Sequence, residues 1–273
     1  MRNIMFIGVD KGEGGMTSPA RTAAVASNYE YCAEWVRGMA RGAPVVVLDY
    51  GCGAGEIIRE LGDRNIDAFG CDVFYEGGDY SPSVRKDWLG TRVRRIEGST
   101  IPFPSEHFDF IINNQVLEHV QDLDAVLAEM RRVLKPGGSV LSLFPDRTVW
   151  REGHCGIPFL HRFPRGSSAR VYYAAAMRAA GLGHYTDNKT IMKWSRDFCE
   201  WLDRWTYYRP YSELAEKFES HFSPLRHIEE DWLSSRLGTR AALVDWWPVP
   251  LRRFAVSKFA GLIFVCSKPT AAH

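Results

Sequence analysis

Residues 45–56, which read VVVLDYGCGAGE, decide the fold of this chain. The β-branched, apolar run over 43–50 predicts a buried strand. Glycines then alternate at 51, 53 and 55, and the apolar spacing of 56–61 predicts a helix. Glycine permits a positive φ and lets a ligand lie against bare main chain, while the amino end of a helix favours negative groups. The stretch predicts a loop that binds a nucleotide-like ligand at the carboxyl end of a sheet.

Two acids accompany this loop. Asp49 ends the first strand, and Asp72 follows a second predicted strand, Ile66–Cys71. A carboxylate at the second position suits a ribose, because it can accept hydrogen bonds from both hydroxyls. The glycine spacing is G-x-G-x-G, whereas nicotinamide-dependent dehydrogenases use G-x-G-x-x-G. An NAD-dependent dehydrogenase is therefore the less favoured interpretation.

The rest of the first half alternates strands with helices. Strands are predicted at Val93–Ile96, Phe108–Ile112 and Ser139–Phe144, with an amphipathic helix at Leu123–Leu134. This alternation of strands and helices indicates a parallel sheet with right-handed crossovers. Outside this region we expect a helix within Ser18–Arg41, a possible strand at Leu225–Glu230 and a last strand at Phe259–Cys266.

Three further blocks follow the glycine loop in order. They are Glu97–Pro104 (EGSTIPFP), Phe108–Val120 (FDFIINNQVLEHV) and Val133–Gly138 (VLKPGG). Together with the loop, they resemble the class I S-adenosylmethionine-dependent methyltransferases (type 11-like) over about residues 43–145. The resemblance implies an α/β, Rossmann-like fold: a doubly wound, mostly parallel seven-stranded sheet with an antiparallel last strand. It also implies S-adenosyl-L-methionine as the cofactor. One departure is Glu97, where the family usually has aspartate.

The resemblance further implies a set of cofactor-binding residues. The first acid and the glycine loop would hold the methionine end, and the second acid would hold the ribose, with Val73 beside the adenine. Glu97 and the backbone after it would meet the adenine amino group, and residues 113–115 would line the sulfonium end. The candidates are Asp49, Gly51, Cys52, Gly53, Gly55, Asp72, Val73, Glu97, Gly98, Ser99, Asn113, Asn114 and Gln115.

Two histidines are the candidate catalytic residues. Methyl transfer from a sulfonium is a direct displacement, so a base helps only where the acceptor must lose a proton. His119 follows the fourth predicted strand and His154 follows the fifth, and parallel strands end at the ligand face. The alternative for each is structural, with His119 bracing a turn and His154 bonded to backbone.

Acidic residues near these histidines allow two further hypotheses. Asp146 and Glu152 could hold acceptor hydroxyls. With His154 and His161 they could also form a metal site, but their spacings match no metal motif, so no metal is expected.

Residues 145–220 carry 14 of the chain's 35 aromatic side chains, and helical spacing dominates around 169–180 and 193–205. We predict a helical insertion after the fifth strand. Trp194, Trp201 and their neighbours would form either its core or a wall that stacks on the acceptor. Tyr29 and Tyr31 could similarly pack or close over the cofactor.

These observations divide the chain into four parts. They are an N-terminal helical cap (1–42), a cofactor-binding core (43–145), a helical acceptor-binding insertion (146–220) and C-terminal strands that complete the sheet (221–273). Within the last part, the two prolines of Trp246–Pro250 predict a loop, because proline breaks both helix and strand.

Composition narrows the function. Lys plus Arg number 34 and Asp plus Glu 33, giving a net charge of +1, which disfavours a nucleic-acid acceptor. The apolar run at 259–266 is too short to span a membrane, and the 6 cysteines form no CxxC pair, so we expect a cytoplasmic location. We predict O-methylation of a small molecule, such as a sugar or sugar-bearing metabolite. A non-catalytic cofactor-binding module is the alternative, and the oligomeric state stays open.

Overall fold

The computed structural model describes residues 27–186, 189–238, 240 and 246–270. Seven strands form one sheet in the order β3-β2-β1-β4-β5-β7-β6. Strands β1 to β5 are parallel, while β7 runs antiparallel to both β5 and β6. The strands are β1 (Val46–Tyr50), β2 (Asp67–Asp72), β3 (Val93–Arg95), β4 (Phe108–Asn114), β5 (Leu134–Phe144), β6 (Arg226–His227) and β7 (Leu262–Ser267). The predicted sheet and its antiparallel last strand are confirmed.

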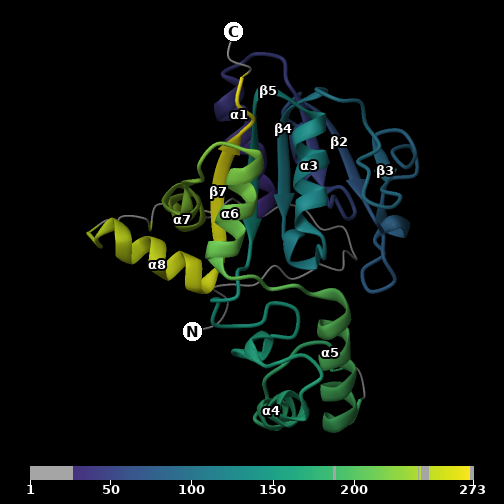
Figure 1. The fold of residues 1–273 in the computed structure, drawn as a ribbon, viewed down its shortest axis with the longest axis vertical. Helices are drawn as coiled ribbons and strands as arrows, with labels where there is room; N and C mark the ends of the chain where they lie inside the picture. The colour runs from purple at the N-terminus through teal and green to yellow at the C-terminus, as the bar shows by residue number, and fades with distance from the viewer. Residues whose placement is uncertain (1–26, 187–188, 239, 241–245, 271–273) are drawn as a thin grey trace, which may run out of the picture.

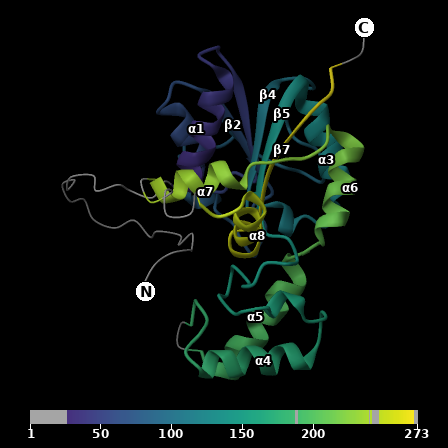
Figure 2. The same cartoon turned by 90° about the vertical axis from the view of Figure 1, so that its left-hand side faces the viewer.

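Helices cover both faces of the sheet (Figures 1 and 2). On one face, α3 (Leu123–Val133) and α6 (Tyr211–His221) pack on β4, β5 and β7 through a core that includes Met130 and Phe218. On the other face lie α1 (Asn28–Ala40), α2 (Glu56–Gly62), α7 (Glu229–Leu237) and α8 (Val249–Phe259). Apolar residues alternate between the two cores along each central strand, as a sheet covered on both faces requires.

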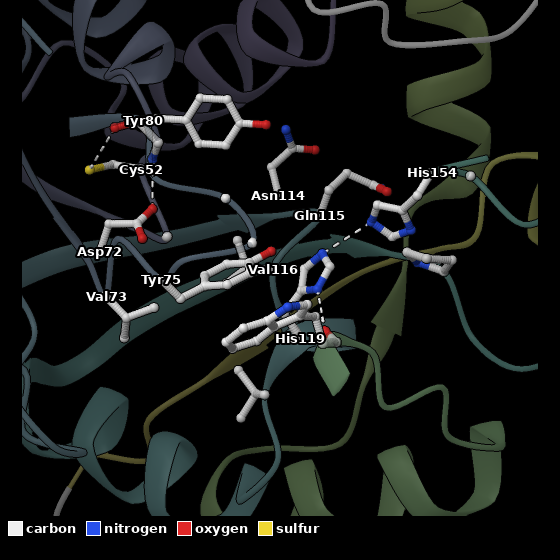
Figure 3. Close-up of a pocket in the computed structure, with 18 of the residues that line it drawn as sticks. Cys52, Asp72, Val73, Tyr75, Tyr80, Asn114, Gln115, Val116, His119 and His154 are labelled. Carbon is white, nitrogen blue, oxygen red and sulfur yellow. Dashed lines mark hydrogen bonds between the residues drawn. The ribbon is translucent and has the colours of Figure 1, made fainter. Parts of the chain in front are cut away.

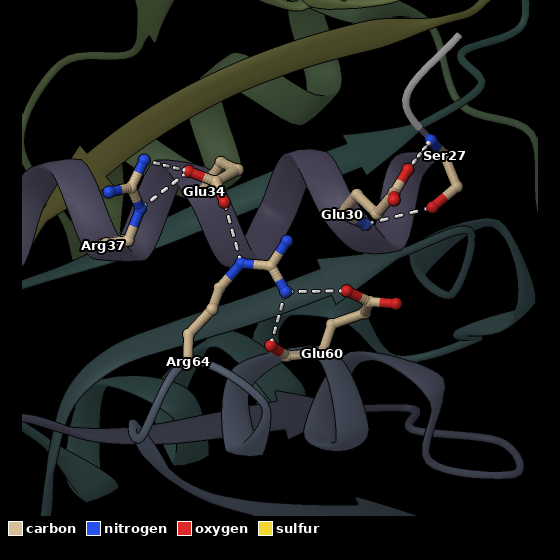
Figure 4. A network of polar contacts seen from close by, with 6 residues as sticks. All are labelled: Ser27, Glu30, Glu34, Arg37, Glu60 and Arg64. Carbon is tan, nitrogen blue, oxygen red and sulfur yellow. Dashed lines mark hydrogen bonds and ion pairs between the residues drawn. The ribbon is translucent and has the colours of Figure 1, made fainter. Parts of the chain in front are cut away.

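The first helix is fixed at its start and along its side (Figure 4). Ser27 caps α1 by accepting from the Glu30 backbone, and the Glu30 carboxylate accepts from the Ser27 backbone in return. Arg64, just beyond α2, bridges Glu34 of α1 and Glu60 of α2. The predicted helix within 18–41 thus begins at Asn28, and its residues 18–26 lie outside the described part of the chain.

The helical insertion has a core of its own. It contains α4 (Ser168–Ala179) and α5 (Ile191–Trp205), which lie beyond the carboxyl end of the sheet (Figure 1). Its buried side chains, including Ile157, Leu160, Trp194 and Leu202, form a cluster separate from the two cores of the sheet.

The insertion is shorter than the predicted 146–220. α6 lies inside that range but packs against α3 on the sheet, because Leu214 and Phe218 belong to the core of that face. The packing unit of α4 and α5 therefore ends near Trp205.

The C-terminal part holds more helix than expected. Beside β6 and β7 it contains α7 and α8. The prediction that Trp246–Pro250 is all loop is wrong, since α8 begins at Val249, with Pro248 as its N-cap and Pro250 in its first turn. Proline breaks a helix interior, but the first turn needs no N–H from it and its fixed φ suits a helix start.

The described residues also include three short 3-10 helices: η1 (Ser81–Ser83), η2 (Leu117–His119) and η3 (Leu160–Arg162). Within the described residues, no helix is both long and apolar enough to cross a bilayer.

Candidate active site

A cleft of about 1890 Å³ runs along the carboxyl ends of the parallel strands and on to the insertion. The glycine loop and the residues after β2 and β4 line one part of it. Tyr75, Trp201, Trp205 and Tyr208 line the part beneath the insertion. Figure 3 shows the labelled side chains from the two parts facing one cavity.

Most of the predicted cofactor residues line this cleft. They are Asp49, Gly51, Cys52, Gly53, Asp72, Val73, Gly98, Ser99, Asn114 and Gln115. The loop glycines at 51, 53 and 55 all have positive φ. A side chain at 51 would collide with Val116, so only glycine permits this close approach of loop and β4 turn.

Three predicted cofactor residues do not line the cleft. Asn113 is fully buried and its amide donates to Ser142, because side chains alternate along β4 and this one points to the opposite face from Asn114. Gly55 is the N-cap of α2, and a side chain there would meet Trp88. Glu97 is exposed to solvent. These three residues thus lie outside the lining of the cleft, unlike the other ten candidates.

The two acids of the loop occupy an unusual environment. Asp49 is 2% exposed, and burial, with Asp72 and Glu56 nearby, raises the pKa of its carboxyl well above the ordinary range. Burial also raises the pKa of Asp72, although its oxygens accept from the backbone N–H groups of Gly53 and Phe74, both at 2.9 Å. Asp72 thus orders the glycine loop itself, and its remaining lone pairs face the cleft.

Two hydrogen bonds beside the glycine loop connect three elements of the fold. The Asn28 amide donates to the side chain of Asn114 at 3.1 Å, and the Trp232 indole donates to Asn28 at 3.0 Å. This joins α1, β4 and α7. Tyr29 lines the cleft, whereas Tyr31 is buried in the core, so only the first of the two tyrosines reaches a ligand.

The structure brings the two candidate catalytic histidines together. His119 Nε2 and His154 Nε2 are 3.1 Å apart, although the residues are 35 positions apart in sequence. The Nδ1 of His119 donates to the Trp205 carbonyl at 2.6 Å, and the Nδ1 of His154 donates to Glu152 Oε1 at 2.6 Å. Both rings are therefore held through one nitrogen and present the other toward the cleft.

Charges around the pair shift its protonation. Burial and the neighbouring His154 lower the pKa of His119 to about 4. Burial alone would lower the pKa of His154, but Glu152 and Glu118 outweigh it and raise that pKa. Although burial opposes it, His154 and the Cys155 N–H hold the pKa of Glu152 below its usual range. His154 is the more basic of the two rings.

Two acids near the histidines, Glu152 and Asp146, were predicted to hold acceptor hydroxyls, but both lie outside the lining of the cleft. Glu152 is fully buried and outside the cleft lining, where it accepts from His154, from the Cys155 N–H at 2.7 Å and from the Tyr208 hydroxyl at 2.8 Å. It positions His154 rather than an acceptor. Asp146 is also buried and accepts from Thr148, away from the cleft.

No sequence pattern predicts a ligand-binding role for Glu118, which precedes His119 in the chain. Its carboxyl is 2% exposed, and burial raises its pKa to about 7. Aromatic rings complete this end: Tyr75 lies 4.7 Å from Trp205, and Trp201 lies 5.0 Å from His154, between ring centroids.

A glycine turn, two acids and a cleft at the carboxyl ends of parallel strands define an α/β protein built for a nucleotide-like ligand. Residues 48–142 match the family described as "Methyltransferase domain". This part of the chain is thus similar to the class I S-adenosylmethionine-dependent methyltransferases, in agreement with the resemblance of its sequence blocks.

Curated relatives match part of the chain. Over 96 residues the chain is 33% identical to a sterol 24-C-methyltransferase of Gibberella zeae, covering 34% of this chain and 25% of that protein. Over 104 residues it is 27% identical to a ubiquinone biosynthesis O-methyltransferase of Agrobacterium fabrum, covering 38% and 42%. The chain thus matches less than half the length of these relatives. A solved S-adenosylmethionine-dependent methyltransferase from Mesorhizobium loti has a TM-score of 0.48 at 14% identity, covering 88% of this chain and all of that one.

Proposed function

We propose that this chain transfers a methyl group from S-adenosylmethionine to a small-molecule acceptor, on an oxygen of a sugar or sugar-bearing metabolite. The observation that carries the proposal is the single cleft that joins the glycine loop to the His119–His154 pair. One end has the features of a cofactor site, and the other has a base and aromatic rings. Relatives named as O- and C-methyltransferases support methyl transfer and leave the acceptor atom to the site.

The residues present suit the cofactor. The bare main chain at Gly51 and Gly53 leaves room for the methionine part, and the buried Asp49 would accept from its ammonium group. Asp72 would accept from the ribose hydroxyls, with Val73 and Tyr80 beside the base. When bound, S-adenosylmethionine supplies an activated methyl group on sulfur.

The far end of the cleft suits a hydroxylated acceptor. The apolar faces of a sugar pack well on aromatic rings, which Tyr75, Trp201 and Trp205 provide in the lining. His154 is oriented by Glu152 and can take the acceptor's proton as the new oxygen–carbon bond forms. A neutral amine can attack the methyl group before it loses a proton, so the base favours an acceptor that must give up its proton, such as a hydroxyl.

The proposal is tested in two stages. Calorimetric titration with S-adenosylmethionine, S-adenosylhomocysteine and NAD should give micromolar binding of the two adenosyl compounds and none of NAD. Binding of NAD alone would favour the dehydrogenase. A panel of sugars and nucleotide sugars is then incubated with the loaded protein, and methylated product is detected by mass spectrometry. Cofactor binding without turnover on any hydroxylated acceptor would favour the non-catalytic module.

His154→Ala and Gly53→Val separate the two ends. His154→Ala should lose turnover and keep cofactor affinity. Gly53→Val should weaken cofactor binding, because residue 53 has a φ of +52° that a branched side chain disfavours. Normal turnover in His154→Ala would reject it as the base.

A further inference from the structure

The three side chains of Glu118, His119 and His154 form a cluster in the wall of the cleft. One ligand atom from each lies within 4.8 Å of those from the other two. His119 and Glu118 come from η2 after β4, and His154 comes from the segment that follows β5. Figure 3 shows the two imidazoles converging, with a dashed line between their nitrogens.

The hydrogen bonds around the two rings fix where their protons are. The Trp205 carbonyl can only accept, so His119 Nδ1 carries a hydrogen. The Glu152 carboxylate likewise accepts from His154 Nδ1. In two neutral rings both Nε2 atoms therefore have bare lone pairs, which face each other at 3.1 Å. Such an arrangement is repulsive unless a positive species lies between the nitrogens.

Glu118 supplies the second observation. The residue is 2% exposed, and neither of its carboxyl oxygens has a hydrogen-bond partner among the residues that the structure describes. A buried carboxyl without partners is costly, so it calls for an explanation in a native protein. The explanation must also account for its position next to two imidazole nitrogens that converge at 3.1 Å.

We propose that Glu118, His119 and His154 bind one divalent transition-metal ion such as Zn²⁺. Two nitrogens at about 2.1 Å from a tetrahedral zinc lie about 3.4 Å apart, close to the spacing found here. Glu118 breaks no side-chain hydrogen bond when it rotates to complete the set. Imidazole nitrogens favour zinc, iron, cobalt or nickel over magnesium.

The surroundings of the cluster agree with this assignment. Histidines that bind metals usually donate their other N–H to a carbonyl or a carboxylate, which fixes the ring and raises its basicity. His119 and His154 do one each, with Trp205 and Glu152. Sequence spacing misses the site, because 35 positions separate its two histidines.

The role of the ion rests on the proposed function, whereas its binding does not. Three protein ligands leave a coordination position open. An acceptor hydroxyl in that position loses its proton more readily, since a bound metal lowers its pKa. In the metal-loaded protein the imidazoles act as ligands and the released proton passes to water. In the metal-free protein His154 is the base.

Direct metal binding tests the inference without an acceptor. The whole chain is dialysed against a chelator and titrated with Zn²⁺ by calorimetry, with Co²⁺ absorption as the report on coordination. We expect one equivalent of Zn²⁺ and visible Co²⁺ bands. Glu118→Gln, His119→Gln and His154→Gln should each weaken binding at least tenfold, and Glu152→Gln about 10–100-fold.

His227→Gln is the matched control. His227 also pairs with a buried glutamate, Glu229 at 2.8 Å, but lies outside the cleft lining. Zn²⁺ affinity should be unchanged in this variant. No stoichiometric binding, or equal binding in Glu118→Gln and the parent, would overturn the inference and leave an imidazole–imidazolium hydrogen bond in its place. Zinc binding without binding of S-adenosylmethionine would instead contradict the proposed function and keep the metal site.

Discussion

The two walls of the cleft are built in different ways. At the glycine loop, the proposed cofactor would mainly meet main chain: three alternate glycines with positive φ, backbone N–H groups and the start of α2. Under the insertion it falls on side chains from distant parts of the chain, such as His119, His154 and Trp201. Main-chain recognition needs particular residues at fixed spacing, whereas a side-chain wall needs only a fold that gathers them. For the first wall the sequence therefore predicts both the residues and their arrangement, whereas for the second it offers candidate side chains but not how they meet.

The largest expected effect falls on the side-chain wall. His154→Gln should lower kcat by about 10²–10⁴-fold. The site then lacks either the base that takes the acceptor's proton or one ligand of the proposed metal ion. The dissociation constant of S-adenosylmethionine should stay within about twofold of the parent. Steady-state kinetics and calorimetry on the same preparation measure both. A matching loss of cofactor affinity would mean that the two walls are not separable.

The converse change is made at the glycine loop. Asp72→Ala removes a carboxylate that accepts hydrogen bonds from Gly53 and Phe74 and that we propose binds the ribose. Cofactor affinity should fall about 10–100-fold, since hydrogen bonds to a charged group contribute about 1.5–3 kcal/mol. Zn²⁺ affinity should be unaffected. Equal loss of zinc and cofactor in this variant would show a general collapse of the cleft.

A smaller effect concerns stability, because the buried carboxyl of Asp49 at the glycine loop lowers the free energy of unfolding at neutral pH. The buried Asp49 has a raised pKa, so the folded protein holds a proton that the unfolded chain releases above about pH 4. The penalty is absent at low pH and grows as pH rises toward the folded-state pKa. Asp49→Asn should therefore increase the free energy of unfolding at pH 8 by about 0.5–2 kcal/mol, with a smaller gain at pH 5. Urea denaturation at both pH values measures this, and a less stable variant at pH 8 would contradict it.

The smallest effect lies outside both walls. Glu34→Gln removes two partly exposed ion pairs of Glu34 (Figure 4). One is with Arg37 in the same helix, and the other is with Arg64 beyond α2. Such pairs contribute about 0–1 kcal/mol, so urea denaturation should show a change in that range. Affinity for S-adenosylmethionine should not change. A large loss of affinity would show that the position of α1 matters to the cleft through Asn28 and Asn114.

The same contrast explains what sequence alone could predict. The strand before Gly51 and the acids at 49 and 72 stand out, because their roles depend on local spacing. Residues 113–115 were predicted together, and Asn113 lies outside the lining, since the family blocks name a segment and not the face of β4 on which each side chain lies. The His119–Glu118–His154 cluster depends on how the insertion folds back, which no local pattern encodes. Likewise the sequence predicts that Pro250 breaks a helix, because the sequence does not show that a helix begins at the preceding residue.

Because of the placement of α5, the intrinsic tryptophan fluorescence of the protein should report on the contents of the cleft. Trp194, Trp201 and Trp205 lie along one side of that helix and line the cleft, with Trp201 close to both histidines. Indole emission is sensitive to nearby charge and to water. The arrival of a positively charged sulfonium, of a transition metal or of a stacking sugar should each change the intrinsic fluorescence in a different way. Occupancy of the cleft can thus be followed in real time, in the unlabelled protein, before any acceptor is known.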